Sequence, residues 1–330
     1  MKNKMAKRIW ITWENQRRNR TLSNALKAAL FEFDVRSNKF VRYLISVAET
    51  LTVFIKEKPD LIFVSNPSIL LAFIAVNFGK IFNVSVVVDA HNAGIFPFEG
   101  TNSWANKIAF YLMRNADITI VTNERLADYV FNKGGKSFVL PDPIPEFTKF
   151  DTLGSKKNLK GKYNIFYICT FAEDEPYLEV IKAARLLNND TYVYISGKTN
   201  GKETEFKDIL PNNVILTNYL LEKEYIEMLY SIDTILVLTT LKDCLLCGAY
   251  EAVAVEKPLI VSNTETLRRY FSKGTLYTDN THRDIALKIN ESLKNREMLT
   301  EEIKALKKQL TVEWDKRKNA FEELLQKLYS

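Results

Sequence analysis

The sequence predicts an α/β protein with two doubly wound parallel sheets, one in each half of the chain. Short β-branched and apolar runs alternate with segments of helical periodicity through most of the 330 residues, and this alternation favours parallel βαβ units. The rhythm breaks at Pro141-Asp142-Pro143-Ile144-Pro145, because proline continues neither a helix nor a central strand. A chain of this length is typical of about two domains.

The first predicted domain is 1–145. Its expected strands, where apolar and β-branched residues cluster, are 8–12, 30–34, 61–64, 85–89, 118–121 and 138–140. Its expected helices, where apolar residues recur every three to four positions, are 22–30, 41–56, 67–79, 104–115 and 124–133. Pro67 stands at the start of one helix, where its missing N–H group does no harm.

The second predicted domain, 163–312, follows a Lys-, Gly- and Asn-rich linker at 146–162. Its expected strands are 165–168, 192–196, 214–217, 234–238 and 259–262. Its expected helices are 177–187, 223–230, 246–255, 266–271, 283–293 and 301–309. A last helix, 313–328, ends the chain. Such sheets bind ligands at the carboxyl ends of their strands, here between the two domains.

Charge and cysteine content indicate the compartment. The net charge is +6, which suits phosphate ligands or an anionic membrane face. We expect no nucleic acid among the partners. Three cysteines argue for a reducing compartment. The N-terminus has no signal-peptide pattern, and the longest apolar stretch, 69–78, is shorter than the about 20 residues that span a bilayer. We expect a cytoplasmic protein, or one peripheral to the inner face of the cell membrane.

Several motifs are absent, and their absence narrows the chemistry. No G-x-G-x-x-G occurs, which argues against a dinucleotide-dependent dehydrogenase. No D-x-D occurs and there are only two histidines, so we expect no metal site. Cys244 and Cys247 form a C-x-x-C without a second pair of ligands. We interpret these two cysteines as packing residues rather than as a redox motif or half of a zinc site.

The most informative segment begins where the strand 234–238 ends. A polar loop brings Asp243 to the mouth of the sheet, and Glu251 follows nearly two turns into the next helix. At such a helix start the backbone N–H groups can bind a diphosphate without a metal, and the expected donors are those of Leu245, Leu246 and Cys247. A carboxylate such as Glu251 can accept both hydroxyls of a ribose. The alternative is an acidic residue before a helix and a solvated glutamate within it.

This segment resembles the acid-x7-Glu signature of GT-B glycosyltransferases, in the group 1, family-4-like branch. The matching residues are Asp243-Cys-Leu-Leu-Cys-Gly-Ala-Tyr-Glu251 and then Lys257-Pro258. Further landmarks of that family occur in the same order along the chain: Asp89-Ala90-His91-Asn92, Ile120-Val121-Thr122-Asn123, Val139-Leu140-Pro141-Asp142 and Trp314. The resemblance therefore runs through most of the chain.

The resemblance implies two Rossmann-like domains facing a central cleft, with a C-terminal helix that crosses back to the first domain. It implies a transferase that moves a sugar from a UDP- or GDP-sugar, with no separate cofactor, in a retaining and metal-independent reaction. The donor would bind mainly to the second domain. The acceptor, a lipid-linked glycan of cell-surface polysaccharide synthesis, would bind to the first domain at the cytoplasmic membrane face.

The resemblance also implies roles for single residues. Asp243 would hold hydroxyls of the donor sugar, Glu251 the ribose, and His91 the sugar near the reacting carbon. Judged without the resemblance, a lone histidine such as His91 is more often a structural hydrogen-bonding group. The second domain departs from the family pattern in two places: Cys244-Leu245-Leu246 replaces a glycine-rich stretch, and the turn Cys169–Pro176 contains no basic residue.

Another residue must therefore offset the charge of the diphosphate. The candidates are Lys198, after a strand of the second domain, and Arg17 and Arg18, after the first strand of the chain. The two arginines could equally contact an acidic acceptor or belong to a solvated basic turn. Thr170, in the turn without a basic residue, completes the expected donor site.

Two rival functions remain open at this point. A nucleotide-sugar 2-epimerase shares the fold class, although the first domain offers few catalytic acids and histidines for it. A two-domain binding protein without catalytic activity is the other, against which the spacing of Asp243 and Glu251 argues.

Overall fold

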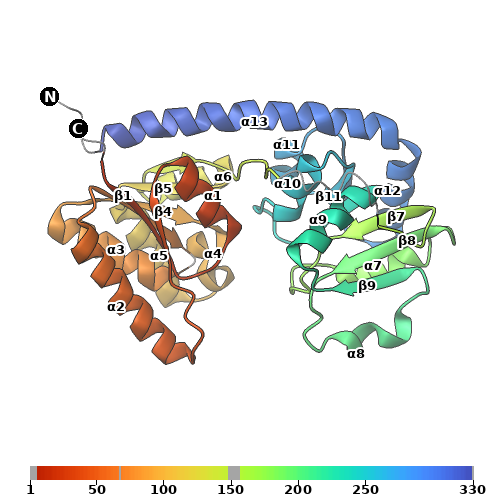
Figure 1. Ribbon diagram of the computed structural model, residues 1–330, viewed down its shortest axis with the longest axis horizontal. Helices are drawn as coiled ribbons and strands as arrows, with labels where there is room; N and C mark the ends of the chain where they lie inside the picture. The colour runs from red at the N-terminus through yellow and green to blue at the C-terminus, as the bar shows by residue number, and fades with distance from the viewer. Residues whose placement is uncertain (1–5, 67, 148–156, 329–330) are drawn as a thin grey trace. The chain divides into compact units, whose positions relative to one another are not determined.

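The computed structural model describes residues 6–66, 68–147 and 157–328. The chain divides into two compact units (Figure 1). Unit 1 comprises residues 1–142 and 313–330, and unit 2 comprises residues 143–312. Within the predicted linker, residues 148–156 lie outside the described part of the chain. Each unit is built on one parallel sheet with flanking helices, as the sequence predicts.

The sheet of unit 1 has the strand order β2-β1-β3-β4-β5-β6. Its strands are β1 (Arg8–Thr12), β2 (Ala29–Glu32), β3 (Leu61–Asn66), β4 (Ser85–Ala90), β5 (Ile118–Val121) and β6 (Ser137–Val139). The helical segments of the same part of the chain are α1 (Arg17–Ala25), α2 (Lys39–Glu57), α3 (Ile69–Phe82), α4 (Asn92–Ile95), η1 (Pro97–Gly100), α5 (Ser103–Asn115) and α6 (Glu124–Asn132).

The first helix differs most from its prediction. It begins at Arg17, not at residue 22, and ends at Ala25. Its buried face includes Arg18 and Asn19 beside Leu22, so polar residues occupy positions where an amphipathic helix ordinarily has apolar ones. The short segments α4 and η1 were not predicted, because neither is long enough to carry a periodic pattern.

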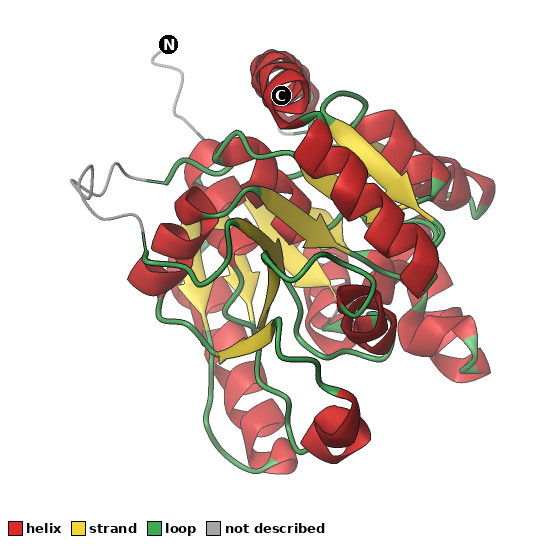
Figure 2. Cartoon of the chain, turned by 90° about the vertical axis from the view of Figure 1, so that its right-hand side faces the viewer, coloured by secondary structure: helices red, strands yellow, loops and turns green. Residues whose placement is uncertain are grey.

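The sheet of unit 2 has the order β12-β11-β10-β7-β8-β9. Figure 2 shows strands with helices packed around them. Its strands are β7 (Tyr163–Tyr167), β8 (Thr191–Ser196), β9 (Val214–Asn218), β10 (Thr234–Val237), β11 (Leu259–Ser262) and β12 (Thr275–Thr278). The helical segments of this part are α7 (Tyr177–Ala184), α8 (Glu203–Phe206), η2 (Lys207–Ile209), α9 (Glu222–Ser231), α10 (Cys247–Ala254), α11 (Glu265–Tyr270), α12 (His282–Lys294) and α13 (Arg296–Gln326). β12 was not predicted, and the helices expected at 301–309 and 313–328 are one helix.

The end of α13 completes the core of unit 1. The indole Nε1 of Trp314 donates to the Pro141 carbonyl at 2.9 Å. Phe321 is fully buried, with its ring centroid 4.7 Å from that of Phe138. These contacts explain why residues 313–330 group with unit 1 although 170 residues of unit 2 precede them in sequence.

Each sheet has one point where the strand order changes direction. In unit 1 it lies between β1 and β3, and in unit 2 between β7 and β10. The helices that follow the two central strands diverge there, which leaves room outside the carboxyl ends of the strands. The loops after these strands are therefore the first places to look for a ligand site.

Candidate functional site

In unit 2, the turn after β7 wraps around a carboxylate. Glu175 Oε2 accepts hydrogen bonds from the backbone N–H of Thr170 at 2.8 Å and of Ala172 at 2.9 Å. The Thr170 hydroxyl donates to the same oxygen at 3.0 Å. Phe171, between these donors, has a φ of 59° and a buried side chain. The turn thus forms a cradle of donors of the kind that binds anions, occupied here by the protein's own carboxylate.

Asp174, the residue before Glu175, joins this turn to the loop after β10. The Asp174 carboxylate accepts from the Thr239 hydroxyl at 2.6 Å, and its carbonyl accepts from the Thr240 N–H at 2.8 Å. The two loops that flank the switch point are therefore held to each other by side-chain and backbone bonds. Asp174 and Glu175 were not identified from the sequence, although three consecutive acids in the turn that follows a strand were the available signal.

The loop after β10 leads into α10, which begins at Cys247 with Leu246 as its N-cap residue. Of the three predicted backbone donors, only Cys247 lies in the first turn of the helix, and Leu245 and Leu246 precede it. A Cβ on Gly248 would lie 3.0 Å from Ile168, so the helix start packs closely against the chain that leaves β7.

The two carboxylates of the predicted signature lie on this loop and helix. Asp243 is half-buried in the loop, and its Oδ1 is 3.4 Å from the Thr266 hydroxyl. Glu251 is half-buried on α10 and accepts a hydrogen bond from the hydroxyl of Tyr225, on α9. Tyr225 was not predicted to take part. Its hydroxyl fixes the orientation of the Glu251 carboxylate.

The loop after β8 brings basic residues next to the turn after β7. Gly197 has a φ of 100°, and a Cβ there would lie 2.2 Å from the Cys169 carbonyl oxygen, so only glycine fits this approach. Lys198 follows, exposed, with its ammonium 5.4 Å from the centroid of the Tyr219 ring. Lys202, missed by the sequence analysis, donates to the Phe171 carbonyl at 2.8 Å.

The cysteines of unit 2 differ in exposure. Burial, reinforced by the Glu175 carboxylate, raises the pKa of the Cys169 thiol well above its usual range, and burial raises that of Cys244 to about 11. Cys247 is exposed, so the packing interpretation is wrong for this residue. Among the described residues, no group of three or more His, Cys, Asp or Glu side chains is arranged to hold a metal ion.

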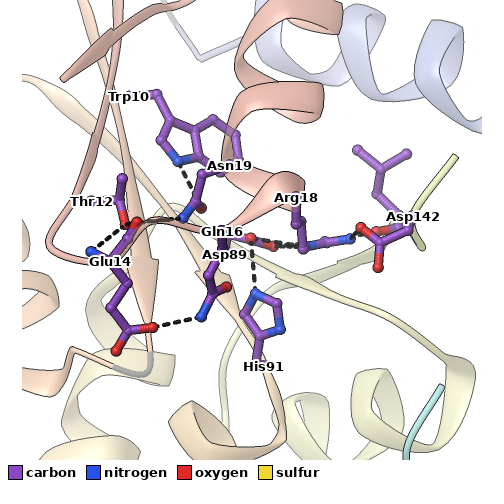
Figure 3. Close-up of polar contacts among 10 residues, drawn as sticks. Trp10, Thr12, Glu14, Gln16, Arg18, Asn19, Asp89, His91 and Asp142 are labelled. Carbon is purple, nitrogen blue, oxygen red and sulfur yellow. Dashed lines mark hydrogen bonds and ion pairs between the residues drawn. The ribbon is translucent and has the colours of Figure 1, made fainter. Parts of the chain in front are cut away.

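In unit 1, Arg18 lies inside the protein rather than on a solvated turn (Figure 3). Its guanidinium bonds the Asp89 carboxylate through Nε at 2.9 Å and Nη2 at 2.7 Å. It also donates to Asp142 Oδ1 and to the Leu140 carbonyl, each at 2.9 Å. These bonds engage four of the five N–H groups of the side chain, so the predicted grip on a diphosphate has almost no donor left.

This network fixes the charge of Asp89, which is fully buried. Burial alone would raise the pKa of its carboxyl group, but Arg18 and His91 outweigh this effect and hold that pKa well below its usual range. The pKa of Arg18 is raised in turn, because the two carboxylates outweigh its burial. Asp89 is therefore an anion throughout the physiological pH range.

His91 follows β4 and turns one ring nitrogen toward this anion. Nε2 lies 3.6 Å from Asp89 Oδ2 (Figure 3). The side chain remains 28% exposed, so the imidazole is held by the carboxylate without being enclosed. The structure thus brings together His91 and Arg18, two predicted residues, through Asp89.

The loop after β1 forms a separate polar cluster. Thr12, the last residue of β1, accepts from the Asn19 side chain at 2.9 Å, and Gln16 donates to Glu14 (Figure 3). Arg17, at the start of α1, is exposed. The structure thus separates two neighbouring arginines to which the sequence analysis gave one role.

The chain was compared with known families and structures. Residues 150–309 match the model of a family described as glycosyl transferases group 1. Anabaena HepE in complex with UDP and glucose is similar at 13% identity and a TM-score of 0.73, over 96% of this chain and 91% of HepE. Sucrose-phosphate synthase from Thermosynechococcus elongatus is similar at 17% identity and a TM-score of 0.71, over 89% and 80% of the two chains.

A candidate UDP-N-acetylglucosamine 2-epimerase from Listeria monocytogenes is also similar, at 13% identity and a TM-score of 0.57 over 91% of each chain. No curated protein matches the sequence significantly. At these identities the structural likenesses establish the fold, whereas the family match bears on the chemistry of unit 2.

Proposed function

We propose that this chain, which has a GT-B fold and matches the glycosyl transferases group 1 family over residues 150–309, moves a sugar from a UDP- or GDP-sugar to a lipid-linked glycan. One observation carries the proposal: the family match covers unit 2, where Asp243 and Glu251 lie on the loop and helix that follow a strand of the switch point. The relative HepE was crystallised with UDP and glucose, which makes UDP the first nucleotide to test.

Glu251 is proposed to bind the ribose. A carboxylate can accept two vicinal hydroxyls at once, and the Tyr225 hydroxyl already orients this one. Asp243, on the preceding loop, is proposed to accept hydroxyls of the donor sugar. Both side chains are half-buried, so hydrogen bonds to them are less exposed to competition from water.

The diphosphate is proposed to lie at the start of α10, where the Cys247 N–H belongs to the positive end of the helix. Lys198 supplies the cation in this proposal, because it is exposed beside the same switch point whereas Arg18 is bound to Asp89. The N–H and hydroxyl groups of Thr170 both donate hydrogen bonds to Glu175. We therefore propose that Thr170 shapes the turn rather than binds the donor. Charge stabilisation on the leaving diphosphate would then need no metal.

His91 is proposed to contact the donor sugar from unit 1. The anionic Asp89 beside it would fix the orientation of the imidazole. Arg17, exposed at the start of α1, is proposed to contact an anionic group of the acceptor. Retention of configuration, a role in polysaccharide synthesis and a cytoplasmic location at the membrane remain part of the proposal.

The experiment that tests the proposal measures UDP binding by thermal shift and donor hydrolysis with UDP- and GDP-sugars. Replacing Glu251 with alanine leaves two ribose hydroxyls without a partner, so we expect nucleotide affinity to fall by about 1.5–3 kcal/mol. Glu323 is an exposed carboxylate of unit 1. The variant Glu323→Ala is therefore the matched control and should bind UDP like the parent.

An unchanged UDP affinity in folded Glu251→Ala protein contradicts the ribose assignment. Analysis of the sugar product separates the rival enzyme, since a 2-epimerase changes the sugar without any acceptor. Loss of activity with EDTA that magnesium or manganese restores would contradict the proposed metal independence.

A further inference from the structure

The helix α2 carries an apolar stripe on its solvent side. Five exposed residues follow one another at intervals of four, four, three and four positions, which places them on one face of the helix: Phe40, Leu44, Ala48, Leu51 and Ile55. The side chains of Phe40 and Ile55 are 73% and 65% exposed.

The opposite side of α2 faces the core and includes polar residues. Ser46 and Thr50 are buried there beside Val53 and Phe54. The Thr50 hydroxyl accepts from the Trp13 indole at 3.0 Å and donates to the Ser46 carbonyl at 2.7 Å. An ordinary surface helix has its apolar stripe toward the core and polar residues toward water. On α2 large apolar residues also lie on the solvent side, so the core of unit 1 does not account for the exposed stripe.

The last turn of α3 adds to this surface. Ile81 is 75% exposed and Phe82 is also exposed. The ring of Phe82 lies 4.3 Å from that of Phe78, which in turn lies 4.5 Å from that of Phe54 of α2. Figure 1 shows the two helices on the same part of unit 1. We call the five residues of the stripe, Ile81 and Phe82 the α2–α3 face.

The charges around the α2–α3 face are mostly positive. The segments 39–58 and 69–83 contain five basic and two acidic residues. The basic ones are all exposed: Lys39, Arg42, Lys56, Lys58 and Lys80. Of the acids, Glu57 is already paired with Lys7 at 2.7 Å. Apolar side chains framed by lysine and arginine are typical of helices that lie in the plane of an anionic membrane surface.

A second copy of the chain fits this face less well. A symmetric dimer would place the same patch against itself and so bring basic residues together. Anionic lipid headgroups would instead pair with them. None of the helices in the described ranges is long and apolar enough to cross a membrane, so the contact would lie on the bilayer surface.

We propose that the α2–α3 face docks unit 1 on an anionic bilayer. The inference deepens the proposed function, since a lipid-linked acceptor must be met at a membrane, but the face itself is independent of the donor site. Exposed large apolar groups would enter the interfacial region while the basic residues meet the headgroups.

The test is sedimentation of the full chain with vesicles of phosphatidylcholine alone or of equal parts phosphatidylcholine and phosphatidylglycerol. We expect binding to the mixed vesicles, weaker at high salt because the charges are screened. The double variant Leu44→Glu with Ile55→Glu should bind at least about 10-fold more weakly, because it removes apolar area and adds negative charge. The control Leu186→Glu with Leu287→Glu changes two exposed leucines of unit 2 and should bind like the parent.

Equal binding of parent and Leu44→Glu/Ile55→Glu protein, or no binding of the parent to mixed vesicles, overturns the proposal. A parent dimer in the ultracentrifuge that the double variant abolishes, without vesicle binding, would assign the face to a second copy instead. UDP binding, measured on the same proteins in solution, should not differ between parent and variants. If neither the parent nor the variants bind UDP, that result counts against the proposed function and leaves the docking result standing.

Discussion

Arg18 shows how one residue can be misjudged when only its neighbours in sequence are known. It stands between Arg17 and Arg20 in a run that reads as a basic surface turn, yet its partners Asp89 and Asp142 lie 71 and 124 positions away. Contacts between residues so far apart in sequence cannot be inferred from the residues that surround Arg18. Glu175, by contrast, closes onto Thr170 only five positions away, so an acid placed after a strand could have been recognised as part of the turn.

Replacing Arg18 with methionine leaves the Asp89 carboxylate buried without its main counter-charge. We expect a loss of about 3–5 kcal/mol in the free energy of unfolding at neutral pH, measured by urea denaturation. Arg20→Met is the control: Arg20 pairs with Glu32 on the surface, and such a pair contributes less than about 1 kcal/mol.

The same variant should change how stability depends on pH. In the parent the pKa of Asp89 is lowered, so its contribution is present above the ordinary carboxyl pKa and is lost as pH falls through the folded value. Without Arg18, burial raises that pKa, and the penalty then grows as pH rises. The difference in stability between parent and variant should therefore shrink from pH 7 to about pH 5. A difference that is constant across this range would contradict the network as described.

At the scale of elements, the strands and most helices were predictable because parallel strands buried on both faces are continuous apolar runs. The errors fall where that signal is weak. α1 buries Arg18 and Asn19, and β12 has only two buried residues among its four, both threonines. The alternation of strands and helices also predicted that Asp243 lies on the loop after β10 and Glu251 on the helix that follows it. It could not place Tyr225 beside Glu251, because that contact depends on how α9 packs against α10.

The contact between the loop after β8 and the turn after β7 can be tested at Gly197. An alanine Cβ there would meet the Cys169 carbonyl at 2.2 Å, in a backbone conformation with positive φ. We expect Gly197→Ala to lower the free energy of unfolding by more than about 2 kcal/mol. Gly201 also has a positive φ but open space around it, so Gly201→Ala should cost only about 1 kcal/mol. If both variants lose the same free energy of unfolding, the contact of Gly197 with Cys169 does not contribute beyond the strain of the positive φ.

At the scale of the molecule, all four tryptophans lie in unit 1, at positions 10, 13, 104 and 314. Tryptophan fluorescence therefore reports the unfolding of unit 1 alone. Phe321 is fully buried there, so Phe321→Ala should destabilise unit 1 by about 3–5 kcal/mol through the cavity it leaves. The fluorescence transition should move to lower urea, while UDP binding by unit 2 is expected to be retained below that transition. Unchanged fluorescence in Phe321→Ala would show that the end of α13 is not part of the unit 1 core.

The grouping of residues 313–330 with unit 1 also has a consequence for synthesis on the ribosome. Unit 2 is one continuous stretch of chain, whereas unit 1 lacks Trp314 and Phe321 until unit 2 has been translated. Domains generally fold as units while the chain emerges. Unit 2 can therefore complete its sheet on a nascent chain while residues 6–142 still lack the packing of α13. Chaperones that shield exposed apolar surface would then be needed longer by residues 6–142 than by unit 2.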